Sequence, residues 1–531
     1  MRIRGSGSRL ALLAMVLAVA ALALAACGGG GSTGGGGGES GGETGSSGES
    51  EGTPTDGGTL KVADASEAIT LSPFTEVPDN NSVHVFAQII EPLYRTNKDN
   101  EIEPVLAETT EHSKDYKTWT IGLRKGAKFS DGKPLTAEDV VFSLETARAN
   151  PTWKAFFEPI ESVSAKSNDA VVVKTRSTFP TLETTLSLFA AGIVPKDFGG
   201  ISEKEFERKP MGTGPFMLSK WVPGKSLTLV KNPHYWNPEL PHLDSVVFET
   251  APSDESRTLQ LRGGQLDLIA TPPQAQLESI ENTSGLQVNE FGLSIPDFLL
   301  LNLREPIFKD KRVREAVDLA VDRQGVINAA LSGRGQPGGS WFPPTLDFHD
   351  ASIKPPRDIE KAKELLAEAV KDGVDPTFTL TVFAGQAYAN FASQILQENL
   401  EEVGFTMKIQ QLDEATTLEK VFGNEYEASL YGITSDIPEP SEIVSFYIEL
   451  EALATGAETE PMAKLLQEAL AEPNEAKRGE LYNQIQEIVA NDHNMVILDY
   501  RPWTWASQDN VVGFNTPPTG IPYFAEVGFS G

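Results

Sequence analysis

Residues 123–144 read LRKGAKFSDGKPLTAEDVVFSL, and this stretch shows how strands and helices alternate along the chain. Asp131-Gly132 is typical of a tight hairpin turn, because glycine reaches backbone angles that other residues avoid. Thr136 can cap a following helix, and Asp139, three residues later, completes a capping box. The stretch therefore predicts a hairpin turn that leads into a helix with an apolar face.

The same mixture of strand and helix patterns continues along the rest of the chain. Alternating apolar residues predict strands at residues 57–63 and 378–382. Apolar offsets of 0, 3, 4, 7 and 8 predict two helices with one buried face, at Val313, Ala316, Val317, Ala320 and Val321, and at Ala362, Leu365, Leu366, Ala369 and Val370. Asp358 is placed to cap the second of these helices, and a helix over 392–402 should end at Gly404. Interleaved strands and helices favour an α/β fold.

Motifs for catalysis or metal binding are weak. Gly212-Thr213-Gly214-Pro215 predicts a turn whose glycines adopt unusual backbone angles. His234 and His242 have seven residues between them and no cysteine nearby, so we expect no metal there. No positioned nucleophile or His-Glu-x-x-His helix is found in the folded body. We therefore expect no catalytic residue, metal or cofactor, although chance acidic pairs leave glycoside hydrolysis open.

The N-terminal segment has the layout of a secretory signal. Three arginines precede an apolar run over residues 10–26, and Leu24-Ala25-Ala26-Cys27-Gly28 matches the bacterial lipobox at every position. We expect residues 1–26 to be a lipoprotein signal peptide and Cys27, the only cysteine, to be lipidated. Two acyl chains hold a protein on a membrane. A transmembrane helix is the alternative, because 17 apolar residues are the lower limit of a span.

Residues 27–56 are predicted to be a flexible linker behind this lipid anchor. Residues 28–52 contain 14 glycines and 5 serines, which cannot form a core. A chain of this composition and length reaches roughly 25–30 Å, enough to tether a body close to a membrane. The whole chain carries a net charge of −31, so it repels phosphate and nucleic acid is a poor partner.

Several short motifs resemble, in the same order, those of the family 5 extracellular solute-binding proteins, the peptide and nickel receptors of ABC importers. The motifs are residues 90–94 (IEPLY), 103–108, 123–144, 212–216 (GTGPF), 232–236 (NPHYW), 312–316, 322–323 and 361–366. The resemblance implies a monomeric receptor, not an enzyme, that captures a peptide-like ligand and delivers it to ABC permease subunits. It also implies a place on the outer face of the bacterial cytoplasmic membrane, held by the lipid anchor.

The resemblance further implies a two-lobed clamshell of the periplasmic-binding-protein type. Its discontinuous first lobe would comprise residues 57–92, 209–291 and 502–531, with an extra domain at 93–208 and the second lobe at 292–501. The hinge would be two crossing segments near Phe291 and Tyr500. Ligand would stabilise the closed arrangement through contacts that exist only when both lobes touch it, and the permease would recognise that arrangement.

One position carries a chemical prediction from the same resemblance. Peptide-binding members have a Gly-Trp-x-x-Asp-x-x-Asp-Pro stretch whose first Asp receives the ligand's α-ammonium group. The matching residues here are 432–440, so Asp436 is the predicted ligand-binding residue. Ile433 replaces the Trp and Glu439 replaces the second Asp, so the pocket differs in shape. The alternative is a solvated or helix-capping Asp436.

The ligand itself is less well defined by the sequence. Dipeptide receptors also use an arginine in the second lobe, yet no arginine lies between Arg357 and Arg478. A planar clamp on a carboxylate is therefore missing from that stretch. Longer peptides fit better, while sugars, opines and metal chelates stay open. A secreted hydrolase and an adhesion protein are the competing classes, but the chain shows neither a positioned nucleophile nor repeats.

Overall fold

The computed structural model describes residues 52–74, 80–449 and 451–531. The predicted signal peptide, Cys27 and nearly all of the predicted linker lie outside the described residues. Within the described ranges, no helix combines the length and the apolar character needed to cross a membrane.

One large mixed sheet runs through the whole molecule. Its strands follow the order β16-β15-β17-β13-β18-β12-β2-β11-β10-β9, and β14 pairs with β18 at one side. Their bounds are β2 (Thr59–Asp64), β9 (Phe216–Val222), β10 (Ser226–Lys231), β11 (Ser245–Thr250), β12 (Leu268–Ala270), β13 (Leu286–Leu301), β14 (Gln336–Pro337), β15 (Thr377–Phe383), β16 (Thr406–Leu412), β17 (Ala428–Gly432) and β18 (Met495–Gln508). Segments from the start, the middle and the end of the chain thus share one sheet.

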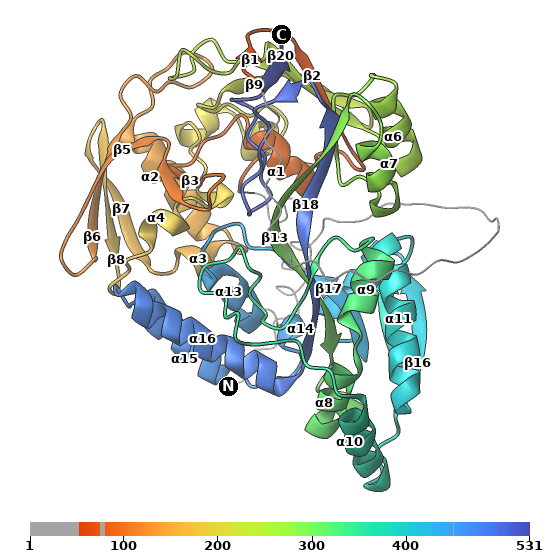
Figure 1. Cartoon of the computed structure of the whole chain (residues 1–531). Coiled ribbons are helices and arrows are strands. Elements are labelled where there is room, and N and C mark those ends of the chain that lie inside the picture. Colours follow the sequence, from red (N-terminus) through yellow and green to blue (C-terminus); the bar gives the residue numbers. More distant parts are fainter. Residues whose placement is uncertain (1–51, 75–79, 450) are drawn as a thin grey trace.

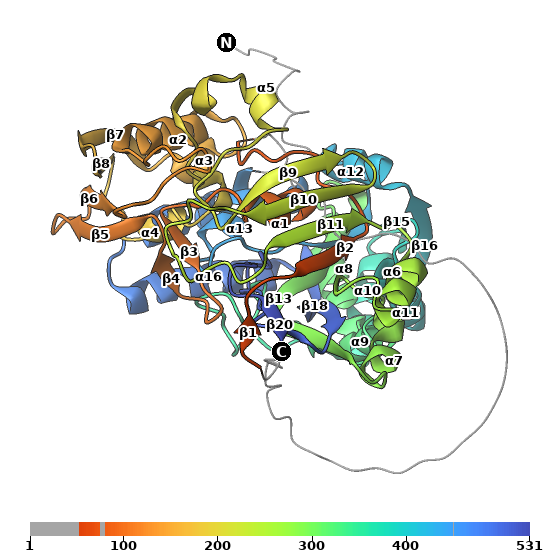
Figure 2. The ribbon, with the colours of Figure 1, turned by 90° about the horizontal axis from the view of Figure 1, so that it is seen from above.

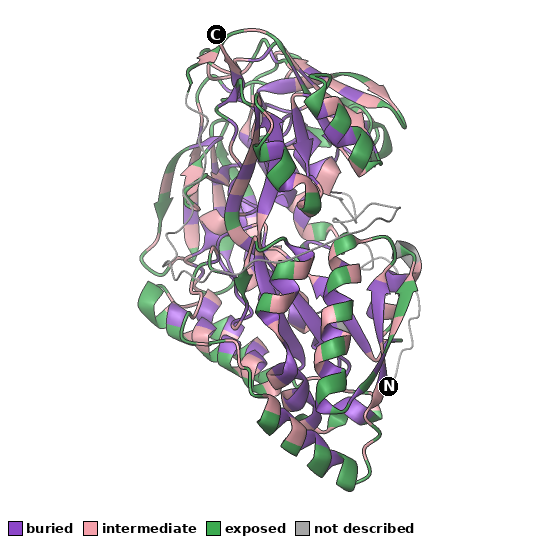
Figure 3. Ribbon diagram, turned by 45° about the vertical axis from the view of Figure 1, so that its right-hand side comes forward, coloured by how far each residue is buried: buried purple, intermediate pink, exposed green. Residues whose placement is uncertain are grey.

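Strands β13 and β18 form a long antiparallel ribbon that joins the two halves of the molecule (Figure 1). The register runs from Leu286 opposite Gln508 to Leu300 opposite Met495, with irregularities near Leu293 and Asp297. Residues 298–301 and 495–500 are buried, because layers of the fold cover both faces of the ribbon there (Figure 3).

Three smaller sheets surround one half of the large sheet. They are a four-stranded antiparallel sheet, a two-stranded hairpin, and a three-stranded sheet whose strands come from near both ends of the described chain. Their bounds are β5 (Ala107–His112), β6 (Thr118–Leu123), β7 (Ile160–Ser167) and β8 (Ala170–Thr175); β3 (Tyr94–Thr96) and β4 (Ile102–Pro104); and β1 (Pro54–Thr55), β19 (Val511–Val512) and β20 (Gly528–Ser530). Figure 2 shows the four-stranded sheet projecting to one side.

The helices cover the outer faces of these sheets (Figure 1). Their bounds are α1 (Asn80–Phe86), α2 (Ala137–Ala149), α3 (Lys154–Phe157), α4 (Leu182–Thr185), α5 (Glu203–Phe206), α6 (Asp254–Arg262), α7 (Leu277–Glu281), α8 (Lys311–Ala320), α9 (Arg323–Ala330), α10 (Ile359–Lys371), α11 (Ala387–Val403), α12 (Glu414–Phe422), α13 (Ser441–Glu449), α14 (Glu451–Ala454), α15 (Glu460–Leu470) and α16 (Glu475–Asp492).

Several predictions about local structure are confirmed. Both halves of the Thr136–Asp139 capping box are present at the start of α2. The Asp358 side chain caps α10, and Gly404 ends α11 with a φ of 113°. Gly132 has a φ of 86° in the predicted hairpin turn. These signals succeed because each depends only on neighbouring residues.

Two predictions about local structure are wrong. Val370 was expected on the buried face of α10 but is 42% exposed, because it lies at the edge of the apolar stripe. Gly212 and Gly214 were expected to need unusual angles, but the structure gives them none. A Cβ on Gly212 would stand 1.9 Å from the Ile89 carbonyl oxygen, and one on Gly214 would stand 2.6 Å from that of Gln88. Close approach of two backbone segments is what requires these glycines.

The hydrophobic core is divided between the two halves. One large cluster takes its members from residues 60–295 and 503–527. Two further clusters take theirs from residues 298–500. The exact boundaries of the two lobes and the extra domain stay predictions, and the names first lobe, extra domain and second lobe are kept below for the residue ranges given above.

Candidate ligand-binding site

Asp436 lies in the loop between β17 and α13, at the end of the sheet that faces the first lobe. Strand β17 pairs with β13, which places Gly432 opposite Asp297 and starts the loop at a fixed point. The Asp436 backbone N–H donates a 2.7 Å hydrogen bond to Glu442 Oε2, on the first turn of α13. This bond ties the loop to the helix and holds Asp436 in a partly buried position.

Glu442 makes Asp436 one member of a carboxyl pair. Glu442 is 1% exposed, and its Oε2 accepts hydrogen bonds from Ser435 Oγ and from the Asp436 N–H, which brings the two carboxyls close together. Burial raises the pKa of Asp436 to about 7. Burial and the nearby Asp436 charge raise the pKa of Glu442 well above its ordinary value. Two adjacent buried carboxyls cannot both ionise cheaply, so they share one proton at neutral pH.

No cation of the described chain balances this pair. Among residues 52–74, 80–449 and 451–531, no lysine, arginine or histidine forms an ion pair with Asp436 or Glu442. Glu442 Oε1 is buried and has no hydrogen-bond partner among those residues. As the pH rises through the pKa of Asp436, the pair gains a negative charge that no described cation compensates.

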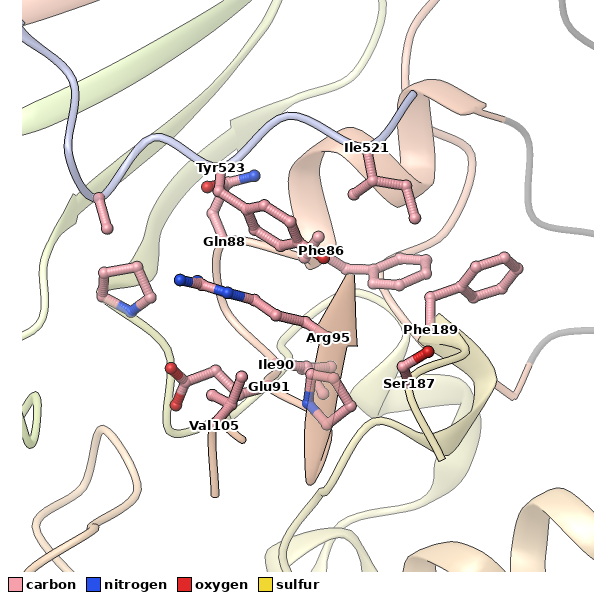
Figure 4. A pocket seen from close by; sticks show the side chains of 14 residues that line it. Phe86, Gln88, Ile90, Glu91, Arg95, Val105, Ser187, Phe189, Ile521 and Tyr523 are labelled. Carbon is pink, nitrogen blue, oxygen red and sulfur yellow. The ribbon is translucent and has the colours of Figure 1, made fainter. Parts of the chain in front are cut away.

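Tyr523, in the C-terminal segment, is influenced by the charge of Asp436. Burial raises the pKa of Tyr523 to about 12, and negative charge on Asp436 contributes to this rise, so the two side chains lie within electrostatic range. The guanidinium of Arg95 stands 4.8 Å from the centre of the Tyr523 ring. Both residues line a small hollow in the wall formed by the first lobe and the extra domain (Figure 4).

Other contacts join the second lobe to the extra domain and neighbouring segments. Glu439 accepts a 2.9 Å hydrogen bond from Tyr482 and lies 3.5 Å from Arg478 Nε, and both partners belong to the second lobe. The rings of Phe156 and Phe446 meet edge to face at 5.1 Å. Burial raises the pKa of Glu439 to about 7. Glu439, which replaces the second Asp of the family motif, is therefore held within the second lobe, while the Phe156–Phe446 ring pair makes the contact with the extra domain.

A second buried carboxyl pair lies in the β13–β18 ribbon. Asp297 and Asp499 are directly opposite in the register, so the charge of one carboxyl disfavours ionisation of the other. Arg501 Nε donates to Asp297 Oδ2 at 2.6 Å, and the Tyr388 hydroxyl donates to Asp499 Oδ2 at 2.7 Å. Burial raises the pKa of Asp499 well above its ordinary value. This pair has its own cation, unlike the pair at Asp436.

The sequence located Asp436 but missed the residues around it. Asp436 is not fully solvated, and it lies five residues before the start of α13, so it does not occupy the cap position of that helix. Glu442 lies only six residues farther along, so the short spacing could have signalled a pair. Arg95 directly follows the IEPLY motif, but nothing in the sequence places Tyr523 beside it. His234 and His242 join no group of three potential metal ligands, and none occurs among the described residues.

Known proteins resemble this chain over most of its length. Residues 101–452, about two thirds of the chain, match the bacterial extracellular solute-binding proteins, family 5 Middle. The probable D,D-dipeptide-binding periplasmic protein DdpA of Escherichia coli K12 is 29% identical over 474 residues, which are 86% of this chain and 91% of that protein.

Solved structures extend the similarity to the fold. The periplasmic binding protein DppA of Helicobacter pylori, in complex with the peptide STSA, matches with a TM-score of 0.79 and 25% identity over 90% of this chain and 99% of that one. The binding protein AgaA of A. tumefaciens R10, in complex with agropinic acid, matches with a TM-score of 0.76 and 24% identity over 89% of this chain and 99% of that one.

The fold and these matches define a protein that binds a solute outside the cytoplasm and serves an ABC transporter. The chain belongs to family 5 of the bacterial extracellular solute-binding proteins. The predicted α/β fold of the periplasmic-binding-protein type is confirmed by these matches. The family consists of solute-binding proteins rather than enzymes, so the secreted hydrolase is ruled out.

Proposed function

We propose that this receptor captures a peptide-like ligand by its ammonium group, which Asp436 and Glu442 bind between the lobes. The observation that carries the proposal is the buried carboxyl pair without a cation in the described chain. A buried charge that the protein leaves unpaired is costly, and a ligand cation removes that cost on binding. A protonated amine also supplies hydrogen-bond donors for the pair's free oxygen.

Peptides fit this chemistry better than the alternative solutes do. A free peptide carries an α-ammonium group, and the relative DppA was solved with the peptide STSA. Sugars carry no such cation. A metal chelate finds no group of three candidate ligands among the described residues. The opine agropinic acid, bound by the relative AgaA, is the alternative that a binding screen should include.

The decisive variant is Asp436→Asn, which keeps the size of the side chain and removes its charge. We expect affinity for a pool of free tri- to pentapeptides to fall by about 2–5 kcal/mol, as for other broken buried charge pairs. Calorimetry and thermal shift should show the loss, and the same pool after N-acetylation should bind the parent protein weakly. The two losses should not add, because both remove one interaction.

The matched control is Asp509→Asn, an exposed aspartate outside the site. It should leave peptide affinity unchanged. Binding of the free pool by Asp436→Asn within about threefold of the parent, a difference near 0.65 kcal/mol, would exclude Asp436 as the ammonium site. Binding of agropinic acid but of no peptide would show that the receptor serves another solute.

We further propose that Cys27 anchors the protein to the outer face of the cytoplasmic membrane. The lipobox at residues 24–28 and the Gly/Ser-rich residues that follow it support this proposal. Cys27→Ser should abolish incorporation of a radiolabelled fatty acid and leave the precursor uncleaved or the protein released. Ser40→Ala, in the linker, is the control and should be labelled as the parent is. Mature-sized Cys27→Ser in the membrane fraction would contradict the anchor.

A further inference from the structure

An aromatic contact joins the extra domain to the second lobe. The rings of Phe156, on α3, and Phe446, on α13, meet edge to face with their centres 5.1 Å apart. Helices α3 and α13 lie in contact, and both views of the ribbon show them on the same side of the β13–β18 ribbon (Figures 1 and 2). The two rings therefore mark a defined point at which the extra domain touches the second lobe.

Each ring is anchored in the core of its own part of the molecule. Phe156 packs against the hydrophobic cluster that contains Trp153 and Phe157, both of them buried. Phe446 packs against a different cluster, which contains Tyr447. Both rings are half-buried. The contact thus spans the boundary between two cores, and the rings can separate without opening either core.

Two further contacts cross the same boundary. Asn100 Nδ2, in the extra domain, donates a 2.7 Å hydrogen bond to the Thr345 carbonyl of the second lobe. Leu470, the last residue of α15, is half-buried and packs against both clusters. The side chains at this boundary are partly exposed, whereas the ribbon that joins the two lobes is buried along residues 298–301 and 495–500. Such an interface between parts of one chain is suited to form and break reversibly.

Phe446 is also linked to the proposed ligand site. Glu442 and Phe446 lie four residues apart on α13, so they share one face of the helix, one turn from each other. Glu442 accepts the hydrogen bond from the Asp436 N–H, while Phe446 contacts the extra domain. One short helix therefore carries both the carboxyl and the ring, and a movement that separates the rings also moves Glu442 away from the extra domain.

We propose that Phe156 and Phe446 form a latch through which the extra domain holds the receptor closed on its ligand. The inference goes beyond the proposed function, because it gives the extra domain a part in ligand retention, and it rests on that function only for the site that the latch closes. Burial of the two rings favours the closed arrangement, and their edge-to-face geometry adds to this burial. Loss of one ring should speed ligand release and leave the ammonium site chemically unchanged.

The first experiment measures how fast the full-length protein releases a pool of free tri- to pentapeptides. Loaded protein is diluted, and the peptides still bound are followed over time by gel filtration and mass spectrometry. Phe156→Leu and Phe446→Leu should each raise the rate of release by about fivefold. The double variant should release peptides no faster than either single variant, because all three lack the same contact. Phe446→Tyr, which keeps the ring, should behave as the parent does.

The matched control is Phe142→Leu. Phe142 and Phe198 also meet edge to face at 5.1 Å and are half-buried, but both belong to the extra domain. This variant should release peptides at the rate of the parent. Release as fast as from Phe156→Leu would attribute the effect to a loosened extra domain and would overturn the latch.

The second experiment measures closure without any peptide. Spin labels are placed at Lys166→Cys in the extra domain and Glu468→Cys on α15, two exposed positions, in a full-length chain whose only natural cysteine is removed by Cys27→Ser. Phe446→Leu should shift the distances between the labels toward longer values, as measured by pulsed electron paramagnetic resonance. Phe142→Leu should leave them unchanged.

The outcomes separate the latch from the proposed function. Release rates within twofold of the parent in both leucine variants would overturn the latch, and so would a double variant whose increase is the product of the two single increases. If no protein retains any peptide, the proposed function fails, and the label distances alone decide. A shift toward longer distances in Phe446→Leu would then support the latch, while unchanged distances would overturn it.

Discussion

The molecule contains two buried carboxyl pairs, and they differ in how their negative charge is compensated. Asp297 and Asp499 in the β13–β18 ribbon are joined by Arg501, so one shared proton leaves that cluster neutral. Asp436 and Glu442 share a proton in the same manner but have no cation among the described residues. The first pair has its compensating positive charge within the described chain, while the second pair lacks one.

The difference separates a structural role from a binding role. A charge cluster that the chain compensates gains nothing from a ligand, and disturbing it costs folding stability. A cluster that the chain leaves uncompensated is a permanent cost to the empty protein, which a suitable cation relieves. Variants of the first pair should therefore change stability, and variants of the second should change ligand affinity and pH dependence.

The largest effect is expected from Arg501→Met. Removing this guanidinium leaves two buried carboxyls without their cation, so the free energy of unfolding should fall by about 3–5 kcal/mol. Chemical denaturation at pH 7 measures the loss. A second substitution, Asp297→Asn, should restore part of it, because it removes the charge that Arg501 had balanced.

The control for this variant is Arg357→Met. Arg357 pairs with Asp322 at 2.8 Å, but its side chain is 46% exposed, so the loss should be below about 1 kcal/mol. Equal losses for Arg501→Met and Arg357→Met would show that the ribbon pair is not a balanced cluster, and the comparison between the two pairs would fail.

A smaller, pH-dependent effect is expected from Glu442→Gln. The pKa of Asp436 is raised to about 7 in the folded protein, so between about pH 4 and pH 7 the folded state binds more protons than the unfolded state. This pair therefore makes the free energy of unfolding fall as pH rises. Glu442→Gln removes a carboxyl whose own pKa is raised well above its ordinary value by burial and by the Asp436 charge, so the fall between pH 5 and pH 8 should be smaller than in the parent by about 1–3 kcal/mol.

Denaturation curves at pH 5, 6, 7 and 8 measure this slope. Glu364→Gln is the matched control, since Glu364 is 69% exposed and should leave the slope unchanged. Parallel pH profiles for the parent and Glu442→Gln would mean that the two carboxyls do not share a proton. They would also contradict the uncompensated negative charge inferred for Asp436 and Glu442.

The smallest effect is expected from Tyr388→Phe. The variant removes one hydroxyl that donates to Asp499 Oδ2, while Arg501 and the ring remain. The free energy of unfolding should fall by about 1 kcal/mol, the usual contribution of one hydrogen bond. Peptide affinity should stay unchanged, because Tyr388 belongs to the balanced pair. Lost affinity with unchanged stability would reverse the roles assigned to the two pairs.

Local features of the fold were predictable from the sequence, because the signals lie within a few residues. Thr136 and Asp139 are three residues apart, and Gly404 directly follows its helix. Val370 was misplaced because offset counting treats the edge of an apolar stripe like its centre. The reason for Gly212 was missed because its neighbour, the Ile89 carbonyl, is more than 120 residues away.

The candidate site was predictable only in part. Asp436 was found through a family motif whose first Asp corresponds to it. Glu442 was missed because its carboxyl reaches back from a helix to the loop before it, a contact that depends on how α13 starts. Arg95 and Tyr523 come from opposite ends of the chain and meet only because the C-terminal segment packs against the first lobe. Such contacts are properties of the tertiary fold.

The β13–β18 ribbon also restricts how this sequence can change over generations. Side chains alternate between the two faces of a strand, so a single inserted or deleted residue turns every later side chain to the other face. Here the shift would pass from the core of one lobe into that of the other, and across the Asp297–Asp499 pairing. Variation along the 16 residues of β13 and the 14 residues of β18 should therefore accumulate by replacement, with length changes confined to the surrounding loops.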